Sequence, residues 1–287
     1  MPDTLDSIMS EFQSRVNSDD TTTMVTQSEI EALKEDTIVI LPAGGKGTRI
    51  RAETHSEGIN KVMIEISGNE SMIERAIRNY SEIGIKRFVV LTGFLADVVE
   101  DHLGNGSKWG VRIAYSEDPD GRKVGNAGAI LNALNNGRIS DSKIAIVHNP
   151  DDLIIGLDRP YGEIFLEGHI KARKNGCIAT FIVVPETLYQ YSGLIINNGH
   201  VLDISKYPPI KIPAHTGITV FDPEVYNYFR KHVSLEVESS FENVICPIIA
   251  RENRLFAINI APKSWIPVND LKGLEVAKKA ILEKEQS

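Results

Sequence analysis

The chain has 287 residues, of which 42% are hydrophobic and 24% are charged. This is enough apolar material for a substantial core, arranged as one large domain or as one domain with an appendage. The formal net charge is −8, and residues 1–36 hold nine acidic and two basic residues, so this segment alone carries −7. The near-neutral remainder lacks the basic surface of a nucleic-acid-binding protein. Any phosphate chemistry must therefore rely on a few placed cations and on backbone N–H groups.

Membrane insertion and secretion are not indicated. No apolar run approaches the roughly 20 residues that a membrane-spanning helix needs, and the acidic first residues lack a signal-peptide pattern. Cys177 and Cys246 stand in apolar surroundings without CxxC spacing, so we expect buried thiols in a reducing compartment. Together these features predict a cytoplasmic protein.

The first 36 residues differ from the rest of the chain. Residues 5–16 place apolar side chains at helical intervals, and residues 28–35 favour a second short helix after a polar linker. An amphipathic helix must bury its apolar face. We therefore expect residues 1–36 to form an acidic helical arm, packed either on its own domain or on a partner subunit.

From residue 37 onward, predicted strands alternate with predicted helices. The expected strands are 37–41, 88–91, 111–115, 144–147 and 178–184, and the expected helices are 71–84, 96–103, 127–134 and 161–175. Such alternation predicts an α/β fold, a Rossmann-like three-layer α/β/α arrangement with a mostly parallel mixed sheet. Further strands at 192–196, 201–205 and 216–221 and a helix at 271–284 divide residues 37–287 into a first part, 37–190, and a β-rich part, 191–287.

The loop after the first strand is rich in glycine. Gly44, Gly45 and Gly47 allow close backbone approach, so that successive N–H groups can point at phosphate oxygens. Lys46 and Arg49 add cationic donors, and arginine can hold phosphate through two parallel hydrogen bonds. Neither GxxxxGK[ST] nor GxGxxG is present. The loop therefore indicates a polyphosphate cradle of another kind.

The order of motifs extends this interpretation. LPAGGKGTRI at 41–50, followed by Lys61 in NKVMIEISG, resembles the sugar-1-phosphate nucleotidyltransferases. The step of 12 residues from Arg49 to Lys61 favours the sugar branch over the shorter-spaced molybdenum-cofactor and isoprenoid cytidylyltransferases. The resemblance covers residues 37 to about 280 and continues through VGNAGAI at 124–130, VHNPDDLI at 147–154 and VLDISKYP at 201–208.

The resemblance implies an enzyme that transfers a nucleotidyl group from a nucleoside triphosphate to a sugar 1-phosphate, with Mg²⁺ as cofactor and pyrophosphate as second product. It also implies roles for individual residues. Arg49 and Lys61 would be catalytic, Asp151 would hold the metal, and the nucleotide would contact Gly44, Gly45, Lys46, Gly47, Thr48, Gly125 and Asn126. Lys206, Gly128 and Asp152 would contact the sugar phosphate.

The nucleotide base is less constrained. Glu117 is our candidate for reading it, and UTP, dTTP or GTP are favoured over CTP and ATP. Without the other motifs, the aspartate pair after the strand would equally indicate a turn or a helix cap. Lys61 and Lys206, taken alone, would be interpreted as solvated side chains.

Four positions depart from the family pattern. Asn60 replaces a proline, Asn126 a threonine and Ser205 a glutamate, while Pro267 stands where a second metal-binding aspartate is usual. Asp270, three residues later, is a doubtful substitute, although Mg²⁺ commonly takes only one or two carboxylates beside phosphates and water. These departures leave open a regulatory nucleotide- or sugar-phosphate-binding protein on the same fold. The acidic arm leaves open an assembly role, and a homo-oligomer is also left open.

Overall fold

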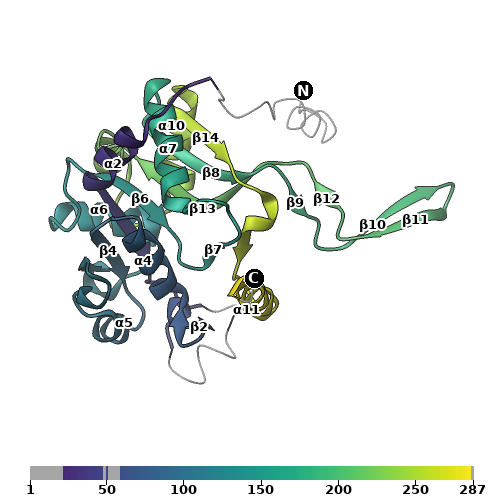
Figure 1. Ribbon diagram of the computed structural model, residues 1–287, viewed down its shortest axis with the longest axis horizontal. Helices are drawn as coiled ribbons and strands as arrows, with labels where there is room; N and C mark the ends of the chain where they lie inside the picture. Colours follow the sequence, from purple (N-terminus) through teal and green to yellow (C-terminus); the bar gives the residue numbers. More distant parts are fainter. Residues whose placement is uncertain (1–21, 48–49, 51–58, 286–287) are drawn as a thin grey trace.

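A seven-stranded sheet forms the centre of the computed structural model, which describes residues 22–47, 50 and 59–285 (Figure 1). Its strand order is β14-β8-β13-β6-β1-β4-β5. The strands are β1 (Thr37–Pro42), β4 (Arg87–Thr92), β5 (Arg112–Glu117), β6 (Ile144–His148), β8 (Ala179–Val184), β13 (Ala214–Phe221) and β14 (Leu255–Asn259). Strand β13 runs antiparallel to both neighbours, and the other pairings are parallel. The mostly parallel mixed sheet is thus confirmed.

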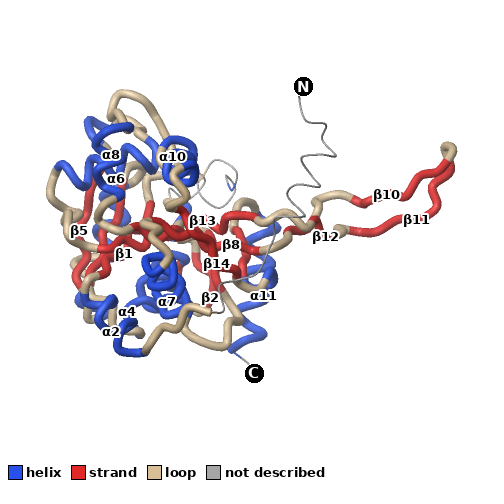
Figure 2. Tube along the Cα trace, turned by 90° about the horizontal axis from the view of Figure 1, so that it is seen from above, coloured by secondary structure: helices blue, strands red, loops and turns tan. Residues whose placement is uncertain are grey.

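Helices cover both faces of this sheet (Figure 2). The alternation of side chains along β1 shows why, because Val39 and Leu41 are buried on one face while Ile38 and Ile40 are buried on the other. The first face is covered by α2 (Gln27–Glu35), α4 (Met72–Glu82), α5 (Ala96–Leu103) and α7 (Tyr161–Lys174). The second is covered by α6 (Gly125–Asn135), α8 (Val225–His232), α9 (Phe241–Val244) and α10 (Cys246–Arg251).

Helix α2 packs on its own chain. Thr26 and Glu29 form a capping box at its start, and Ile30 and Leu33 are buried against the first face of the sheet. Lys34 forms an ion pair with Glu163 of α7 at 2.7 Å. The expected helix at 28–35 is confirmed, and the expected helix at 5–16 lies outside the described residues.

A smaller layer lies beside one end of the sheet. Strand β7 (Asp152–Ile154) pairs antiparallel with β15 (Trp265–Pro267), and β2 (Glu65–Ser67) pairs with β3 (Glu70–Ser71). Helix α11 (Leu271–Glu285) covers these short strands through Leu274, Ala277 and Ile281, the three residues that the sequence aligned on one helix face. This layer supports the segment that follows β6.

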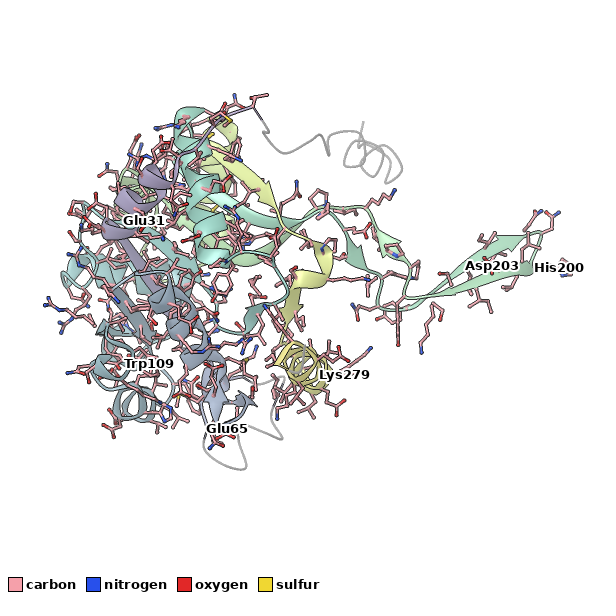
Figure 3. All side chains as sticks on the ribbon, in the orientation of Figure 1. Glu31, Glu65, Trp109, His200, Asp203 and Lys279 are labelled. Atoms are coloured by element: carbon pink, nitrogen blue, oxygen red, sulfur yellow. The ribbon has the colours of Figure 1, made fainter. Side chains whose placement is uncertain are left out.

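A two-stranded arm projects from the body. It consists of β10 (Ser192–Asn197) and β11 (His200–Lys206), joined by Asn198 and Gly199, which have φ of 46° and 79° as a tight hairpin turn requires. Figure 3 shows His200 and Asp203 toward its outer end. Strands β9 (Thr187–Leu188) and β12 (Pro209–Ile210) pair at its base. Because β13 and β14 belong to the central sheet, the β-rich part beyond residue 190 is divided between the arm and the body.

Both cysteines are free and buried, as expected. Among the described residues, no helix combines the length and apolar character needed to cross a membrane.

A buried polar contact fixes the chain at the end of β6. Tyr80 on α4 is fully buried, and its hydroxyl lies 2.9 Å from Nδ1 of His148. The other ring nitrogen, Nε2, lies 2.9 Å from the Asp152 carbonyl oxygen, which can only accept, so Nε2 carries the proton and Tyr80 donates to Nδ1. Burial lowers the pKa of His148 to about 4, which keeps the ring neutral near pH 7.

We expect Tyr80→Phe to lower the free energy of unfolding by about 1–3 kcal/mol, because it leaves Nδ1 of His148 buried without a donor. Urea unfolding measures this change. Tyr228→Phe is the matched control, since the Tyr228 hydroxyl contacts Glu252 at the exposed surface. Equal losses in the two variants would contradict this account of His148.

Candidate active site

The two loops singled out by the sequence meet at one edge of the sheet. From β1 the chain proceeds to β4 and β5 on one side, and then returns to β6 on the other side of β1. The parallel register pairs Ile40 with Val147, so both strands end at the same edge. Ligands of open α/β sheets bind at such a reversal of strand order, beyond the carboxyl ends of the strands.

Lys61 and Asp151 form an ion pair at this edge. Their side chains are 12% and 22% exposed, so the pair is largely withdrawn from water. Lys61 opens the short helix η2 (Lys61–Met63), and the Asp151 carbonyl accepts a hydrogen bond of 2.8 Å from Val268 N–H. Residues from three distant parts of the sequence are therefore joined here.

Asn60 positions this cluster. Its fully buried amide donates to the carbonyl oxygens of Ala43 at 2.8 Å and Phe94 at 2.7 Å, while its side-chain oxygen accepts from Val62 N–H at 3.2 Å. The residue thus ties the loop after β1 to the loop after β4 and caps η2. Proline has no side-chain donor and could form neither hydrogen bond. The asparagine at position 60 therefore anchors the two loops in a way that the usual proline could not.

A cavity of about 350 Å³ lies beside the ion pair, and we name it the loop cavity. Its lining residues are Gly45, Lys46, Gly47, Ile50, Lys61, Lys123, Asp151 and Asn269. Among its described lining residues, Lys46 and Lys61 stand against Asp151, and a third lysine, Lys123, is paired with Glu238, so positive charge prevails. Gly47 has φ of 58°, in the left-handed region that favours glycine. The loop cavity can therefore bind a phosphate-rich ligand.

A second cavity of about 560 Å³ adjoins the first, and we name it the adjoining cavity. Its lining residues are Pro42, Gly44, Gly45, Leu91, Asp118, Lys123, Gly125, Asn126, Ala129, Glu238, Ser239, Ser240 and Asn243. Gly45 and Lys123 line both cavities, so the two lie next to each other. One elongated ligand can occupy them together.

The structure gathers most of the residues expected at the site. Those that line one or both cavities are Gly44, Gly45, Lys46, Gly47, Lys61, Gly125, Asn126 and Asp151. Thr48 and Arg49 lie outside the described residues.

Three expected residues are placed elsewhere by their local packing. Glu117 is exposed at the end of β5, and its neighbour Asp118 lines the adjoining cavity instead. Gly128 faces Val124, since an added Cβ would lie 2.6 Å from the Val124 Cβ. Lys206 ends the projecting arm, with its ammonium group 5.2 Å from the centre of the Tyr207 ring.

The remaining two carboxylates have structural partners. Asp152 accepts hydrogen bonds from Trp265 Nε1 at 2.9 Å and from Asn149 Nδ2 at 3.3 Å. Burial first, and then the negative charge of Asp151, raise the pKa of Asp152 well above its ordinary value. Asp270 accepts from Gly273 N–H at 2.8 Å and thereby caps the start of α11. Neither residue lines the loop cavity.

Two oxygen-bearing side chains in the loop cavity fit a magnesium ion. The described residues contain no cluster of three or more His, Cys, Asp and Glu side chains suited to a metal. Asp151 and Asn269 nevertheless line the same cavity, and carboxylate and amide oxygens are hard ligands that suit Mg²⁺ beside phosphate oxygens and water. Asn269 could not be found from the family motif, because that motif pointed to Pro267, which pairs with Asp152 in the β15–β7 ladder.

Known proteins resemble this chain in both sequence and fold. A family model described as nucleotidyl transferase matches residues 38–284. A UTP–glucose-1-phosphate uridylyltransferase of Synechocystis sp. is 30% identical over 202 residues, covering 65% of this chain and 49% of the relative. A glucose-1-phosphate adenylyltransferase of Thermotoga maritima is 27% identical over 238 residues, covering 76% of this chain and 54% of the relative. The chain thus spans about half the length of these curated relatives.

A solved structure shares the fold. It is described as a proposed glucose-1-phosphate thymidylyltransferase from Bacillus anthracis in complex with sucrose. The TM-score is 0.63 at 21% sequence identity, and the match covers 85% of this chain and 94% of the other.

We expect Asn60→Ala to lower the free energy of unfolding by about 1–3 kcal/mol, because the fully buried Asn60 amide and its hydrogen bonds to the loops after β1 and β4 are lost. Chemical denaturation measures the loss. Asn79→Ala is the matched control, since the half-buried Asn79 amide donates to the Arg75 carbonyl of its own helix and does not join the loops after β1 and β4. A smaller effect at Asn60 than at Asn79 would refute its anchoring role.

Proposed function

This chain belongs to the nucleotidyl transferase family, and on that premise we propose that it transfers a nucleotidyl group from a nucleoside triphosphate to a sugar 1-phosphate. The observation that carries the proposal is the Lys61–Asp151 pair beside Gly45–Gly47 in one positively charged cavity. The uridylyl- and adenylyltransferase relatives support the same reaction class.

This reaction requires the enzyme to position its substrates and does not require a covalent enzyme intermediate. A phosphate oxygen of the sugar 1-phosphate attacks the α-phosphorus in line, a new P–O bond forms, and the bond to the leaving pyrophosphate breaks. The attacking oxygen is already anionic near pH 7, so no general base is required. The enzyme has to hold two mutually repelling anions and neutralise charge on the α-phosphate and leaving group.

The residues of the loop cavity supply these functions. Backbone N–H groups of the glycine loop can bind phosphate oxygens, and Lys46 and Lys123 add cationic charge. We assign Lys61, whose ammonium group is paired with Asp151, to the α-phosphate. The arrangement binds and orients the triphosphate and leaves its α-phosphorus open to attack.

Asp151 and Asn269 would hold Mg²⁺ in this cavity. The ion supplies additional neutralisation of the phosphate charge when bound. An aspartate and an asparagine give fewer negative charges than two aspartates, and the remaining positions fall to phosphate oxygens and water. From the two free, buried cysteines we also infer a reducing, cytoplasmic location.

A regulatory binder on the same fold is the second candidate. Pro267 favours it, because this residue occupies the position of a metal-binding aspartate and carries no side-chain oxygen. The intact Lys61–Asp151 pair favours the enzyme.

We expect Mg²⁺-dependent pyrophosphate release with one pairing from a panel of nucleoside triphosphates and sugar 1-phosphates. Asp151→Asn and Lys61→Ala should each lower the rate by about 10²–10³, as loss of a charge-stabilising group does. Asp270→Asn is the control and should stay near wild type, because asparagine retains the helix cap. No turnover with any pairing, while nucleotides still raise Tm, would favour the regulatory binder.

We expect Asn269→Asp to lower the Mg²⁺ concentration needed for half-maximal rate, because it adds a second carboxylate to the cavity that Asp151 lines. Asn269→Ala should raise that concentration. A Mg²⁺ titration of the two variants measures both shifts, and an unchanged midpoint in both would remove Asn269 from the metal site.

A further inference from the structure

The adjoining cavity lies where the nucleoside of a bound triphosphate would extend, and this step rests on the proposed function. Because Gly45 and Lys123 line both cavities, the adjoining cavity is the nearest space for the rest of a ligand whose phosphates lie in the loop cavity. Its volume of about 560 Å³ is within the range of small-molecule sites. The polar groups on its walls therefore decide which base is accepted.

The charge of the adjoining cavity is opposite to that of the loop cavity. Asp118 and Glu238 line it, and its lining cation, Lys123, forms an ion pair with Glu238 at 2.5 Å. Such walls repel phosphate and suit a neutral ring that presents N–H donors. The opposite charges of the two cavities thus favour one orientation of a bound nucleotide, in which its phosphates lie near the lysines and its base lies near Asp118.

Asp118 is fixed against the backbone of two loops. Its N–H donates to the Thr92 carbonyl at 3.0 Å, continuing the β4–β5 ladder. A Cβ added to Gly93 would lie 2.9 Å from Oδ2 of Asp118, and one added to Gly44 would lie 3.6 Å from it. In the part of the chain that the structure describes, no hydrogen bond to this carboxylate is formed. It is a placed acceptor without a donor.

The surroundings of Asp118 raise its pKa, but only into the mildly acidic range. Burial, and after it the negative charge of Glu117, raise the pKa of Asp118 to about 6, while Lys123 lowers it and Glu238 raises it. At pH 7.5 the carboxylate therefore carries its charge and accepts hydrogen bonds only.

Ser239 provides a second polar group without a partner. Its Oγ is buried and has no hydrogen bond within the described ranges. Its backbone is fixed to the start of α6, since Ser239 N–H donates to the Val124 carbonyl and the Ser239 carbonyl accepts from Ala127 N–H. Gly125 makes this close approach possible, because a Cβ there would lie 2.2 Å from the Ser239 carbonyl oxygen.

Asn126, expected to contact the nucleotide, is engaged within the protein. Its amide nitrogen lies 3.1 Å from a Glu242 carboxylate oxygen, and its oxygen accepts from Phe241 N–H at 3.0 Å. It therefore orients the segment that carries Ser239.

We propose that Asp118 and Ser239 read the nucleotide base and that they select guanine. Guanine presents two adjacent donors, N1–H and the 2-amino group, beside the acceptor O6. A fixed carboxylate can accept from both donors, and a serine hydroxyl can donate to an acceptor. Uracil and thymine offer one N–H between two carbonyl oxygens, which a carboxylate faces unfavourably. Adenine and cytosine offer one amino group beside a ring acceptor.

Binding affinities test this assignment without turnover. Calorimetric titration of the full chain at pH 7.5 with Mg²⁺ compares GTP, UTP, dTTP, ATP, CTP and XTP, in which a carbonyl replaces the 2-amino group of guanine. We expect GTP to bind the wild type at least about 10-fold more tightly than the others, since one lost paired donor costs about that factor. Asp118→Asn should reverse the preference from GTP to XTP, because an amide donates to the new carbonyl.

Two further variants keep the test decisive. Ser239→Ala should weaken GTP binding, while Glu236→Gln, an exposed carboxylate paired with Arg122, should leave the ranking unchanged. Tighter binding of UTP, dTTP, ATP or CTP than of GTP by the wild type overturns the guanine assignment and leaves the proposed reaction standing. Absence of binding by every nucleotide overturns both. GTP binding without turnover with any sugar 1-phosphate overturns only the proposed reaction.

Discussion

The parallel pairing of β1 with β6 is the constraint on which the rest of the site depends. Because Ile40 and Val147 share a register, the glycine loop and the segment carrying Asp151 must leave the sheet at one edge. The reversal of strand order at this point opens the space that ligands of such sheets use. The ion pair between Lys61 and Asp151 then joins the segment after the glycine loop to the segment after β6.

Neighbouring contacts convert this edge into two cavities of opposite character. Asn60 ties the loops after β1 and β4 together, so the backbone of the glycine loop is held on one side. The lysines around the loop cavity favour phosphates, whereas Asp118 places an acceptor in the adjoining cavity. A nucleotide is a molecule with this same polarity, anionic at one end and rich in hydrogen-bonding groups at the other. The nucleotide binding, orientation and base choice that we propose would thus follow from one strand pairing and its flanking loops.

Hydrophobic periodicity predicted the sheet and its helices well, and residues 96–103 form α5 with the expected bounds. Side-chain direction was harder to predict, because β5 continues to Glu117 and alternation then turns Asp118, not Glu117, into the cavity. Lys206 could not be placed from its motif, since nothing in a strand pattern fixes the direction of a projecting hairpin. Strand β14 was missed, because it is short and its side chains are only half-buried or exposed.

A crystal structure of the chain with Mg²⁺ and a non-hydrolysable guanine nucleotide tests the central claim most directly. We expect phosphates against Gly45–Gly47 and Lys61, the metal at Asp151, and the base in the cavity lined by Asp118. Phosphates bound elsewhere, or a metal held away from Asp151, would contradict the assignment of this edge of the sheet as the active site.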